Sequence, residues 1–256
     1  MMKVTIPEAG IDLGSRRVLE PFSAAFDKGS LVGIVGPNGA GKSTLIRLLA
    51  GLLPQSSEAV EVDHWPLSMM PVQDRARRIA WLSQSRELSW DLTVEDVVAL
   101  GRHAWGGGRY DRLGPGDRAI VDDAIARAGA ASLAERHVLA LSGGEQARVH
   151  LARLFAVQAD ILLLDEPLAA LDIAQQLAVL AALREETGKG RLVCLALHDL
   201  ALAADACDRL LVLKEGKLVA DGPPADALNA ATLENVFGVE RDEHGRFKAS
   251  SGPLSA

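Results

Sequence analysis

The sequence is poor in cysteine and has no long apolar run. Cys194 and Cys207 are the only cysteines among 256 residues, and no metal-ligand spacing relates them. This excludes a disulfide-rich scaffold, and we expect two unpaired, buried thiols, as suits a reducing cytoplasm. No apolar stretch approaches the ~18 residues needed to span a bilayer, and residues 1–8 contain no signal-peptide core. We therefore expect a soluble chain that stays in the compartment where it is made.

Positive charge is also in deficit. Lysine and arginine number 27 against 34 aspartates and glutamates, which gives a formal net charge of −7. This balance argues against broad binding to nucleic acid, and we expect no nucleic-acid partner. The rest of the composition, 48% hydrophobic and 24% charged, is that of an ordinary globular protein, and 256 residues suffice for one large domain or two small ones.

Residues 36–43, GPNGAGKS, match the phosphate-binding loop G-x-x-x-x-G-K-[ST] in full. An apolar run at 31–35 precedes the loop and a helical segment at 44–50 follows it, which is the setting that the motif requires. Glycines let backbone N–H groups surround a phosphate, and the helix N-terminus adds partial positive charge. We expect Lys42 to reach the β- and γ-phosphates and Ser43 to hold Mg²⁺. The candidate nucleotide-binding residues here are Gly36, Pro37, Asn38, Gly39, Ala40, Gly41, Lys42, Ser43 and Thr44.

Strands alternate with helices along the rest of the chain. We expect buried strands at 31–35, 79–82, 161–164 and 192–197, preceded by short strands with a hairpin-like turn at 14–17. A hairpin at 209–221 and two short helices complete the fold, and the last dozen residues are expected to be a frayed tail. This alternation predicts an α/β protein with a parallel sheet.

The segment between 87 and 157 is expected to be a mostly helical insertion, because its apolar residues repeat at helical spacing. Thr93 is the expected N-cap of one helix, because Glu95 and Asp96 fall in its first turn. A second helix is expected from about 115 to 129, and a third opens at Ser142. The expected apolar stripe of the second helix is Ile120, Ala124, Ile125 and Ala128.

Polar residues follow three of the expected strands. Asp165 and Glu166 end the strand at 161–164, Gln84 lies just after 79–82, and His198 just after 192–197. A carboxylate at the end of a buried strand needs a partner, which is either Mg²⁺ or the helix N-terminus that it caps. Taken alone, a histidine at a strand end such as His198 is more often a satisfied polar residue than a functional group.

The order of these motifs resembles that of the ATP-binding cassette (ABC) ATPases. Residues 141–145, LSGGE, precede Asp165 and Glu166 by about twenty positions, with Gln84 upstream and His198 downstream. The resemblance spans roughly residues 4–238. It implies a P-loop NTPase core with a parallel sheet, an N-terminal antiparallel β subdomain and an inserted α-helical subdomain. One ATPase domain would occupy 1–240 (core 1–86 and 158–240, helical insertion 87–157), with a C-terminal tail at 241–256.

The resemblance also implies a role for each polar residue. Glu166 resembles the catalytic carboxylate that orients or deprotonates the attacking water, and His198 resembles the histidine that contacts the γ-phosphate and that water. Gln84 resembles the glutamine that senses Mg²⁺ and water. The implied catalytic residues are thus Glu166, His198 and Gln84, the implied metal ligands are Ser43, Gln84 and Asp165, and the cofactors are ATP and Mg²⁺.

A homodimer follows from the same resemblance. In the family, the stretch that corresponds to Ser142, Gly143, Gly144 and Glu145 covers the γ-phosphate bound to the partner subunit. Asp172 lies in a loop that resembles the one touching the opposite subunit. Two ATP molecules would then be held between two head-to-tail chains.

Residues 82–84, 93–102 and 171–176 look like those of ATPases that serve importers for iron-siderophores, haem and vitamin B12. This implies integral membrane permease subunits docked near Gln84 and residues 86–90, a substrate-binding protein, and a peripheral position at the cytoplasmic face of the inner membrane. The alternatives are an exporter's ATPase subunit and a non-transport ABC ATPase. Leu13 departs from the family, which usually has an aromatic residue there to stack on adenine, and Arg16 or Arg17 is the candidate substitute.

Overall fold

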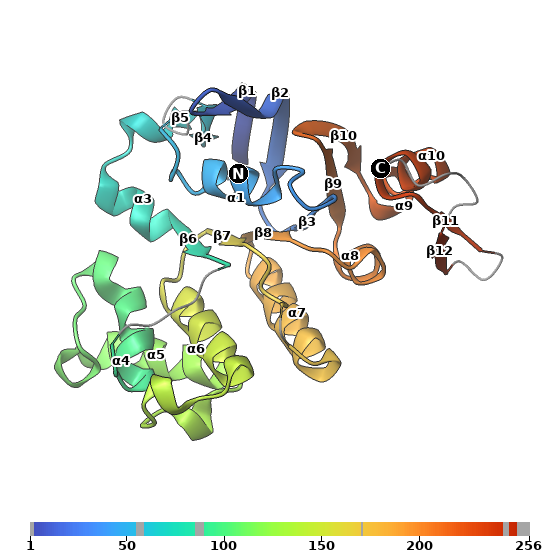
Figure 1. Ribbon diagram of the computed structural model, residues 1–256. Helices are drawn as coiled ribbons and strands as arrows, with labels where there is room; N and C mark the ends of the chain where they lie inside the picture. Colours follow the sequence, from blue (N-terminus) through green and yellow to red (C-terminus); the bar gives the residue numbers. More distant parts are fainter. Residues whose placement is uncertain (1–2, 55–58, 85–89, 170, 243–245, 250–256) are drawn as a thin grey trace.

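The computed structural model describes residues 3–54, 59–84, 90–169, 171–242 and 246–249. Its centre is a six-stranded sheet in the order β10-β9-β3-β8-β7-β6, in which β10 is antiparallel to β9 and the other neighbours are parallel (Figure 1). The predicted α/β fold with a parallel sheet is therefore confirmed. The strands are β3 (Leu31–Val35), β6 (Ile79–Leu82), β7 (Ile161–Leu164), β8 (Leu192–Ala196), β9 (Arg209–Lys214) and β10 (Lys217–Gly222).

Both faces of this sheet are covered, because its residues alternate between two hydrophobic clusters. In β7, Ile161 and Leu163 pack with helix α1 (Lys42–Leu49), whereas Leu162 and Leu164 pack in the cluster that contains the later helices. Every residue of β7 is buried. A strand buried on both faces is a continuous apolar run in the sequence, which is why four consecutive aliphatic residues predicted it correctly.

A four-stranded antiparallel sheet, β2-β1-β4-β5, lies on the α1 side of the central sheet (Figure 1). Its strands are β1 (Lys3–Leu13), β2 (Arg16–Asp27), β4 (Glu61–Val62) and β5 (Trp65–Pro66). The turn between β1 and β2 is Gly14-Ser15, where Gly14 has the positive φ of 62° that glycine adopts readily. The hairpin-like connection expected at 14–17 is thus confirmed, whereas the strands that it joins are long and not short as expected. Register shifts along β1 interrupt the alternation by which two long strands are recognised.

Helices α4 (Val94–Ala99), α5 (Pro115–Arg127) and α6 (Gly143–Ala156) pack on one another beyond the β6 edge of the sheet (Figure 1). Thr93 caps α4 as predicted, since its side chain accepts a hydrogen bond from the Asp96 N–H at 3.3 Å. A 3₁₀ helix, Leu100–Trp105, continues the chain. Helix α3 (Val72–Arg78) leads into β6.

The apolar stripe predicted for α5 is partly wrong. Ile120 is only half-buried, whereas Val121 is fully buried. Val121, Ala124, Ile125 and Ala128 follow the spacing i, i+3, i+4, i+7 that defines one helix face, and Ile120 lies beside that face.

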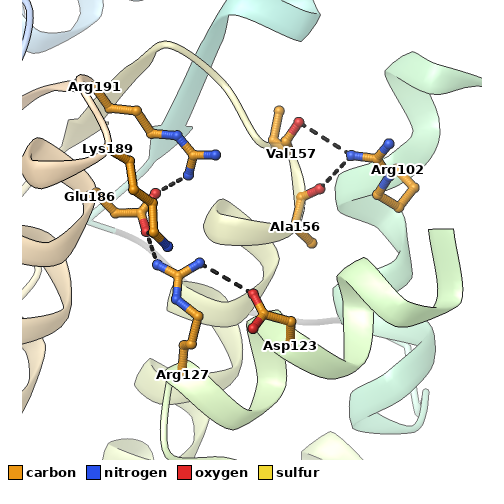
Figure 2. A network of polar contacts seen from close by, with 8 residues as sticks. All are labelled: Arg102, Asp123, Arg127, Ala156, Val157, Glu186, Lys189 and Arg191. Carbon is orange, nitrogen blue, oxygen red and sulfur yellow. Dashed lines mark hydrogen bonds and ion pairs between the residues drawn. The ribbon is translucent and has the colours of Figure 1, made fainter. Parts of the chain in front are cut away.

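Helix α7 (Ile173–Gly188) is joined to α5 by a buried carboxylate. Glu186 has no exposed surface and pairs with Arg127 of α5, with Arg191 before β8, and with Lys189 at 3.1 Å (Figure 2). Arg127 in turn lies over the ring of Phe155 in α6, 4.7 Å from its centroid. A buried charge is costly unless it is paired. Glu186 therefore fixes the insertion helices against the helix that covers the central sheet.

The C-terminal part contains the predicted hairpin of β9 and β10, followed by the short helices α9 (Pro224–Ala227) and α10 (Ala230–Thr232). Strands β11 (Val239–Arg241) and β12 (Phe247–Ala249) pair with each other. The tail expected to fray thus contains one strand, held partly by Arg241, whose guanidinium lies 5.1 Å from the centroid of the Phe247 ring. Residues 250–256 lie outside the described part.

Cys194 and Cys207 are buried and unpaired, as predicted. Cys207 follows α8 (Leu200–Ala206) and packs closely on β3, because a Cβ atom on Gly33 would come within 2.8 Å of its Sγ. In the ranges that the structure describes, no helix combines the length and the apolarity needed to cross a membrane.

Candidate functional site

The carboxyl ends of β6, β7, β8 and β3 meet at one edge of the central sheet. Leu82 is the register partner of Leu164, Leu164 that of Leu195, and Ile34 that of Ala196, so the four strands end almost level. The segments that follow them carry Gln84, the Asp165-Glu166 pair, His198 and the phosphate loop. Open α/β sheets bind their ligands at this edge. The sequence-predicted groups are therefore gathered from four separate parts of the chain.

The loop between β3 and α1 depends on glycine at two positions. Gly39 and Gly41 have φ angles of 77° and 106°, which other residues rarely adopt. A Cβ on Gly41 would also lie 2.6 Å from Cδ2 of Leu19 in β2. The turn of the β9–β10 hairpin supports the loop, because the Gly216 N–H donates to the Ala40 carbonyl at 3.0 Å. Gly36 packs closely against β9, because a Cβ on Gly36 would overlap the Leu213 carbonyl oxygen.

Lys42 is buried at the base of the loop. Its ammonium group donates to the carbonyl oxygens of Gly36 at 2.8 Å and Pro37 at 3.1 Å. Burial lowers the pKa of Lys42, while the carboxylates of Glu166 and Asp165 act in the opposite direction. A phosphate in the loop would offer this ammonium group full negative charge in place of two carbonyl dipoles.

A cavity of about 380 Å³ opens above the loop, which is within the usual range for small-molecule sites. Four segments line it: the start of β2, the phosphate loop with the first turn of α1, the stretch after β6, and the end of β7. The lining residues are Arg16, Val18, Asn38, Gly39, Gly41, Lys42, Ser43, Thr44, Gln84 and Glu166.

Asp165 is fully buried beside this cavity. Its Oδ1 accepts a hydrogen bond from Ser43 Oγ at 2.9 Å, whereas Oδ2 has no hydrogen-bond partner among the described residues. Burial is the main cause that raises the pKa of this carboxyl group; the Ser43 hydrogen bond opposes the rise and the charge of Glu166 adds to it. A buried carboxylate oxygen without a partner, next to a hydroxyl group, fits Mg²⁺, which takes few protein oxygens and completes its shell with water and phosphate. Across the described ranges, no group of three or more His, Cys, Asp or Glu side chains is arranged so that it could hold a metal ion.

Glu166 is held from two sides. Gln84 donates from Nε2 to one carboxylate oxygen at 2.8 Å, and His198 Nε2 lies 2.5 Å from the other. The backbone of Glu166 has a positive φ of 50°, a left-handed conformation that is uncommon for a non-glycine residue. The backbone thus turns sharply after Asp165, so that Asp165 is buried while Glu166 lines the cavity. The three residues predicted as catalytic are therefore in contact.

The LSGGE stretch, residues 141–145, begins α6 and is not part of the cavity lining. Ser142 is the N-cap: its hydroxyl accepts from the Glu145 N–H at 3.4 Å, and a Glu145 carboxylate oxygen accepts from the Ser142 N–H at 2.8 Å. This reciprocal capping box lowers the pKa of Glu145. Ser142 and Gly143 are exposed, and a Cβ on Gly144 would lie 2.8 Å from Gln175 of α7. A helix N-terminus that is open to solvent can accept an anion from another molecule.

Asp172 is the N-cap of α7, where its Oδ1 accepts from the Gln175 N–H at 2.8 Å. It also lines a separate cavity of about 370 Å³ between α5, α6 and α7. The structure therefore brings the loop, Gln84, Asp165, Glu166 and His198 together, but it does not place Ser142 or Asp172 among the residues that line the nucleotide-sized cavity.

Two lining residues belong to the hairpin before the loop. Val18 was not expected from the sequence, and Arg16 was considered only as a substitute for Leu13. The signal was present as the two-residue period of a strand, which gives positions 16 and 18 the same face. Leu13 itself is 43% exposed and does not line the cavity.

Known proteins are similar over nearly the entire chain. The family model of the ABC transporter matches residues 19–169. The chain is 44% identical over 227 residues to the hemin import ATP-binding protein HmuV of Streptomyces coelicolor, which covers 89% of this chain and 80% of the relative. It is 40% identical over 238 residues to the cobalamin import ATP-binding protein BtuD of Halobacterium salinarum, covering 92% of this chain and 59% of the relative. The solved structure of cbiO1 from Clostridium perfringens, part of the ABC transporter complex cbiONQ, superposes with a TM-score of 0.76 at 25% identity, covering 90% and 92% of the two chains.

Proposed function

Because this chain belongs to the ABC transporter family and is an ATP-binding ATPase, we propose that it powers the import of a metal chelate through a separate permease. The cargo class is an iron-siderophore, haem or cobalamin. The observation that carries the proposal is the similarity, over about nine tenths of the chain, to import proteins named for hemin and cobalamin. These relatives favour import over the alternatives of export and of a function outside transport.

The phosphate loop binds the triphosphate in this proposal. Lys42 leaves the carbonyl oxygens of Gly36 and Pro37 for the β- and γ-phosphates, and the N-terminus of α1 offers its backbone N–H groups to the phosphate chain. Ser43, Asp165 and Gln84 would hold the Mg²⁺, with the unpartnered Oδ2 of Asp165 as the strongest support. When bound with the nucleotide, Mg²⁺ neutralises charge on the β- and γ-phosphates.

Glu166 is the catalytic carboxylate in this proposal. It accepts a proton from the attacking water while the water oxygen bonds to the γ-phosphorus and the bond from that phosphorus to the oxygen of ADP breaks. Gln84 and His198 orient the Glu166 carboxylate, which the contacts of 2.8 and 2.5 Å support. His198 is also the group that contacts the γ-phosphate.

The complete ATPase is a homodimer in the same proposal. Residues 142–145 and Asp172 serve the nucleotide of the partner subunit. Ser142, Gly143 and Asp172 are exposed, Gly144 and Glu145 are half-buried, and none of the five lines the cavity of its own chain. Each chain contributes one ATPase domain over 1–240, with the core at 1–86 and 158–240 and the helical insertion at 87–157.

In this proposal, the permease docks on the surface where β6 meets the helical insertion. Of the surface predicted from the sequence, residues 86–89 lie outside the described part, but Trp90 is 71% exposed. Nearby, a cavity of about 220 Å³ between β6, the 3₁₀ helix and α6 contains Arg153, which makes no hydrogen bond or ion pair within the described ranges. Leu100 and Trp105 are exposed on the same 3₁₀ helix. An unpaired guanidinium group next to exposed apolar side chains suits a permease segment that carries a carboxylate. The chain then sits peripherally at the cytoplasmic face of the inner membrane.

Reconstitution tests the function. The chain is purified with its permease, placed in proteoliposomes together with the substrate-binding protein, and supplied with ATP and with haem, cobalamin or a ferric siderophore. We expect ATP-dependent accumulation of one of these chelates and none with Glu166→Gln. Hydrolysis of ATP without uptake of any of the three, or ATP-dependent movement in the outward direction, would contradict the proposal.

A further inference from the structure

Two chemically different sets of residues line the cavity above the phosphate loop. Glu166 and Gln84, which contact each other, form one set, and the terminal phosphate must lie beside it for a water to attack. Arg16 and Val18 of β2 line another part of the wall, and neither has a role in the proposed hydrolysis. A nucleotide whose phosphates occupy the loop must place its base away from the Glu166 carboxylate. The start of β2, which supplies Arg16 and Val18 to the lining, is therefore the candidate contact for the base.

The start of β2 is held firmly at this place. The Glu20 N–H donates to the Gly216 carbonyl at 2.8 Å, and the Gly216 N–H donates to the Ala40 carbonyl of the phosphate loop at 3.0 Å. A Cβ on Gly41 would lie 3.3 Å from the Val18 carbonyl oxygen. These contacts fix the position of β2 relative to the phosphates, so a side chain on its cavity face is at a constant distance from them.

Arg16 and Arg17 point to opposite faces of β2 and differ in their partners. Arg17 donates from Nε to Asp12 Oδ1 at 2.6 Å, so its guanidinium group is occupied away from the cavity. Arg16 lines the cavity and is exposed, and its side chain makes no hydrogen bond or ion pair with any part of the chain that the structure describes. Leu13 is the register partner of Arg16 across the hairpin, which places it on the same face of the sheet.

We propose that Arg16 is the residue that holds the nucleotide base, with its guanidinium plane stacked on the ring. A guanidinium group is planar, delocalised and weakly hydrated, so it stacks on aromatic faces, which an ammonium group does not do. Val18 provides the apolar floor beneath the base, and Leu13 extends the apolar surface beside Arg16. Since every base has a π-face, this contact supports binding without selecting adenine over guanine.

Calorimetric titration of the purified chain with Mg²⁺ present tests this contact. The probes are ADP, GDP and inorganic pyrophosphate, none of which the chain turns over. We expect Arg16→Ala to weaken ADP and GDP by roughly tenfold or more and to leave pyrophosphate unchanged. Arg16→Tyr should restore the affinity for both nucleotides, because it supplies a π-face without a charge, whereas Arg16→Lys should not restore it. Arg17→Ala is the matched control and should match the unmodified chain for all three probes.

Three outcomes would overturn the proposal. Arg16 contacts a phosphate instead if Arg16→Ala weakens pyrophosphate as much as ADP, or if Arg16→Lys restores binding while Arg16→Tyr does not. The base is held elsewhere if Arg16→Ala leaves ADP and GDP binding unchanged. Where pyrophosphate binding is retained, the phosphate loop is intact, and a failure of this proposal is then separate from a failure of the ATPase function.

Discussion

At the scale of single residues, the backbone at Glu166 separates two neighbouring carboxylates into different environments. Asp165 is buried behind the loop, while Glu166 lies in the cavity wall with Gln84 and His198. We expect Glu166→Gln to retain ATP binding and to lower turnover by roughly 10²-fold or more, because a general base contributes about that much. The variant should accumulate as an ATP-bound dimer in size-exclusion chromatography. Glu185→Gln, on the exposed side of α7, is the control and should hydrolyse ATP normally. Normal turnover in Glu166→Gln would remove Glu166 from the catalytic role.

Asp165 leads to a prediction about pH and stability. Burial raises the pKa of Asp165 in the folded chain above the ordinary value of 3.8. The contribution of this group to the free energy of unfolding is therefore fully present below pH 3.8, where Asp165 is protonated in the folded and the unfolded chain. It is lost as the pH rises through the folded-state pKa. Asp165→Asn should therefore stabilise the nucleotide-free chain at pH 7, on the order of 1 kcal/mol, because it removes a buried charge and keeps an acceptor for Ser43.

Thermal unfolding between pH 4 and pH 8 measures this effect. The unfolding temperature of Asp165→Asn should exceed that of the unmodified chain by a margin that grows with pH. The order should reverse when ATP and Mg²⁺ are added, because the variant lacks a carboxylate for the metal. If Asp165→Asn is less stable than the unmodified chain at neutral pH without nucleotide, the buried charge of Asp165 does not destabilise the folded chain and the prediction is wrong.

At the scale of helices and strands, local sequence patterns predicted the elements that are buried on one or both faces. Four aliphatic residues at 161–164 and the GPNGAGKS loop leave few alternatives, so the strand, the loop and the positions of the polar groups after the strands followed from the sequence. Elements with irregular patterns were predicted less well. The register shifts in β1 interrupt its alternation, so the sequence predicts several short strands where there is one long strand. In α5, the predicted apolar face includes the half-buried Ile120 in place of the buried Val121.

Contacts between elements distant in sequence could not be predicted. Nothing in the local pattern around Glu186 distinguishes it from the exposed Glu185, although Glu186 is fully buried among three cations. The ion pairs of Glu186 with Arg127 of α5 and with Arg191 make this difference, and they form only in the folded chain. The position of Arg16 in the cavity wall has the same kind of origin, because hydrogen bonds through the distant Gly216 connect β2 with the phosphate loop.

The cluster around Glu186 gives a prediction for stability. We expect Glu186→Ala to lower the free energy of unfolding by about 3–5 kcal/mol, because Arg127 and Arg191, both largely buried, lose their shared partner. Arg127→Met should lower it by less, since Glu186 keeps Lys189 and Arg191. Urea unfolding curves measure both changes. Arg109→Ala, in an exposed pair with Asp111, is the control and should change stability by less than about 1 kcal/mol. Equal losses from Glu186→Ala and Arg127→Met would show that the cations do not share the carboxylate as described.

At the scale of the whole molecule, the proposed homodimer would place each nucleotide between the cavity of one chain and the exposed N-terminus of α6 of the other. We expect Ser142→Arg to bind ATP as a monomer but neither to dimerise nor to hydrolyse, because the added bulk meets the γ-phosphate held by the partner subunit. Size exclusion with and without ATP, together with nucleotide titration, measures both properties.

Mixing Ser142→Arg with Lys42→Ala tests the arrangement directly. In a mixed dimer, one composite site carries both defects and the other carries neither, so some ATP-dependent dimer should return. Each variant alone places one defect in both sites and should stay monomeric. Loss of ATP binding by the Ser142→Arg monomer would show that Ser142 serves the nucleotide of its own chain.

The burial of both cysteines has a practical consequence for observing this protein at work. The thiolate is the reactive form of cysteine, and burial raises the pKa of both thiols, that of Cys207 to about 12. At neutral pH both native thiols are therefore protonated and shielded from solvent, and a maleimide dye should leave them unlabelled. Single cysteines introduced at the exposed positions Ser132 in the insertion and Glu185 in α7 would then carry a fluorescent pair without replacement of either native cysteine. Energy transfer between the two dyes would report the movement of the insertion relative to the sheet through successive rounds of nucleotide turnover.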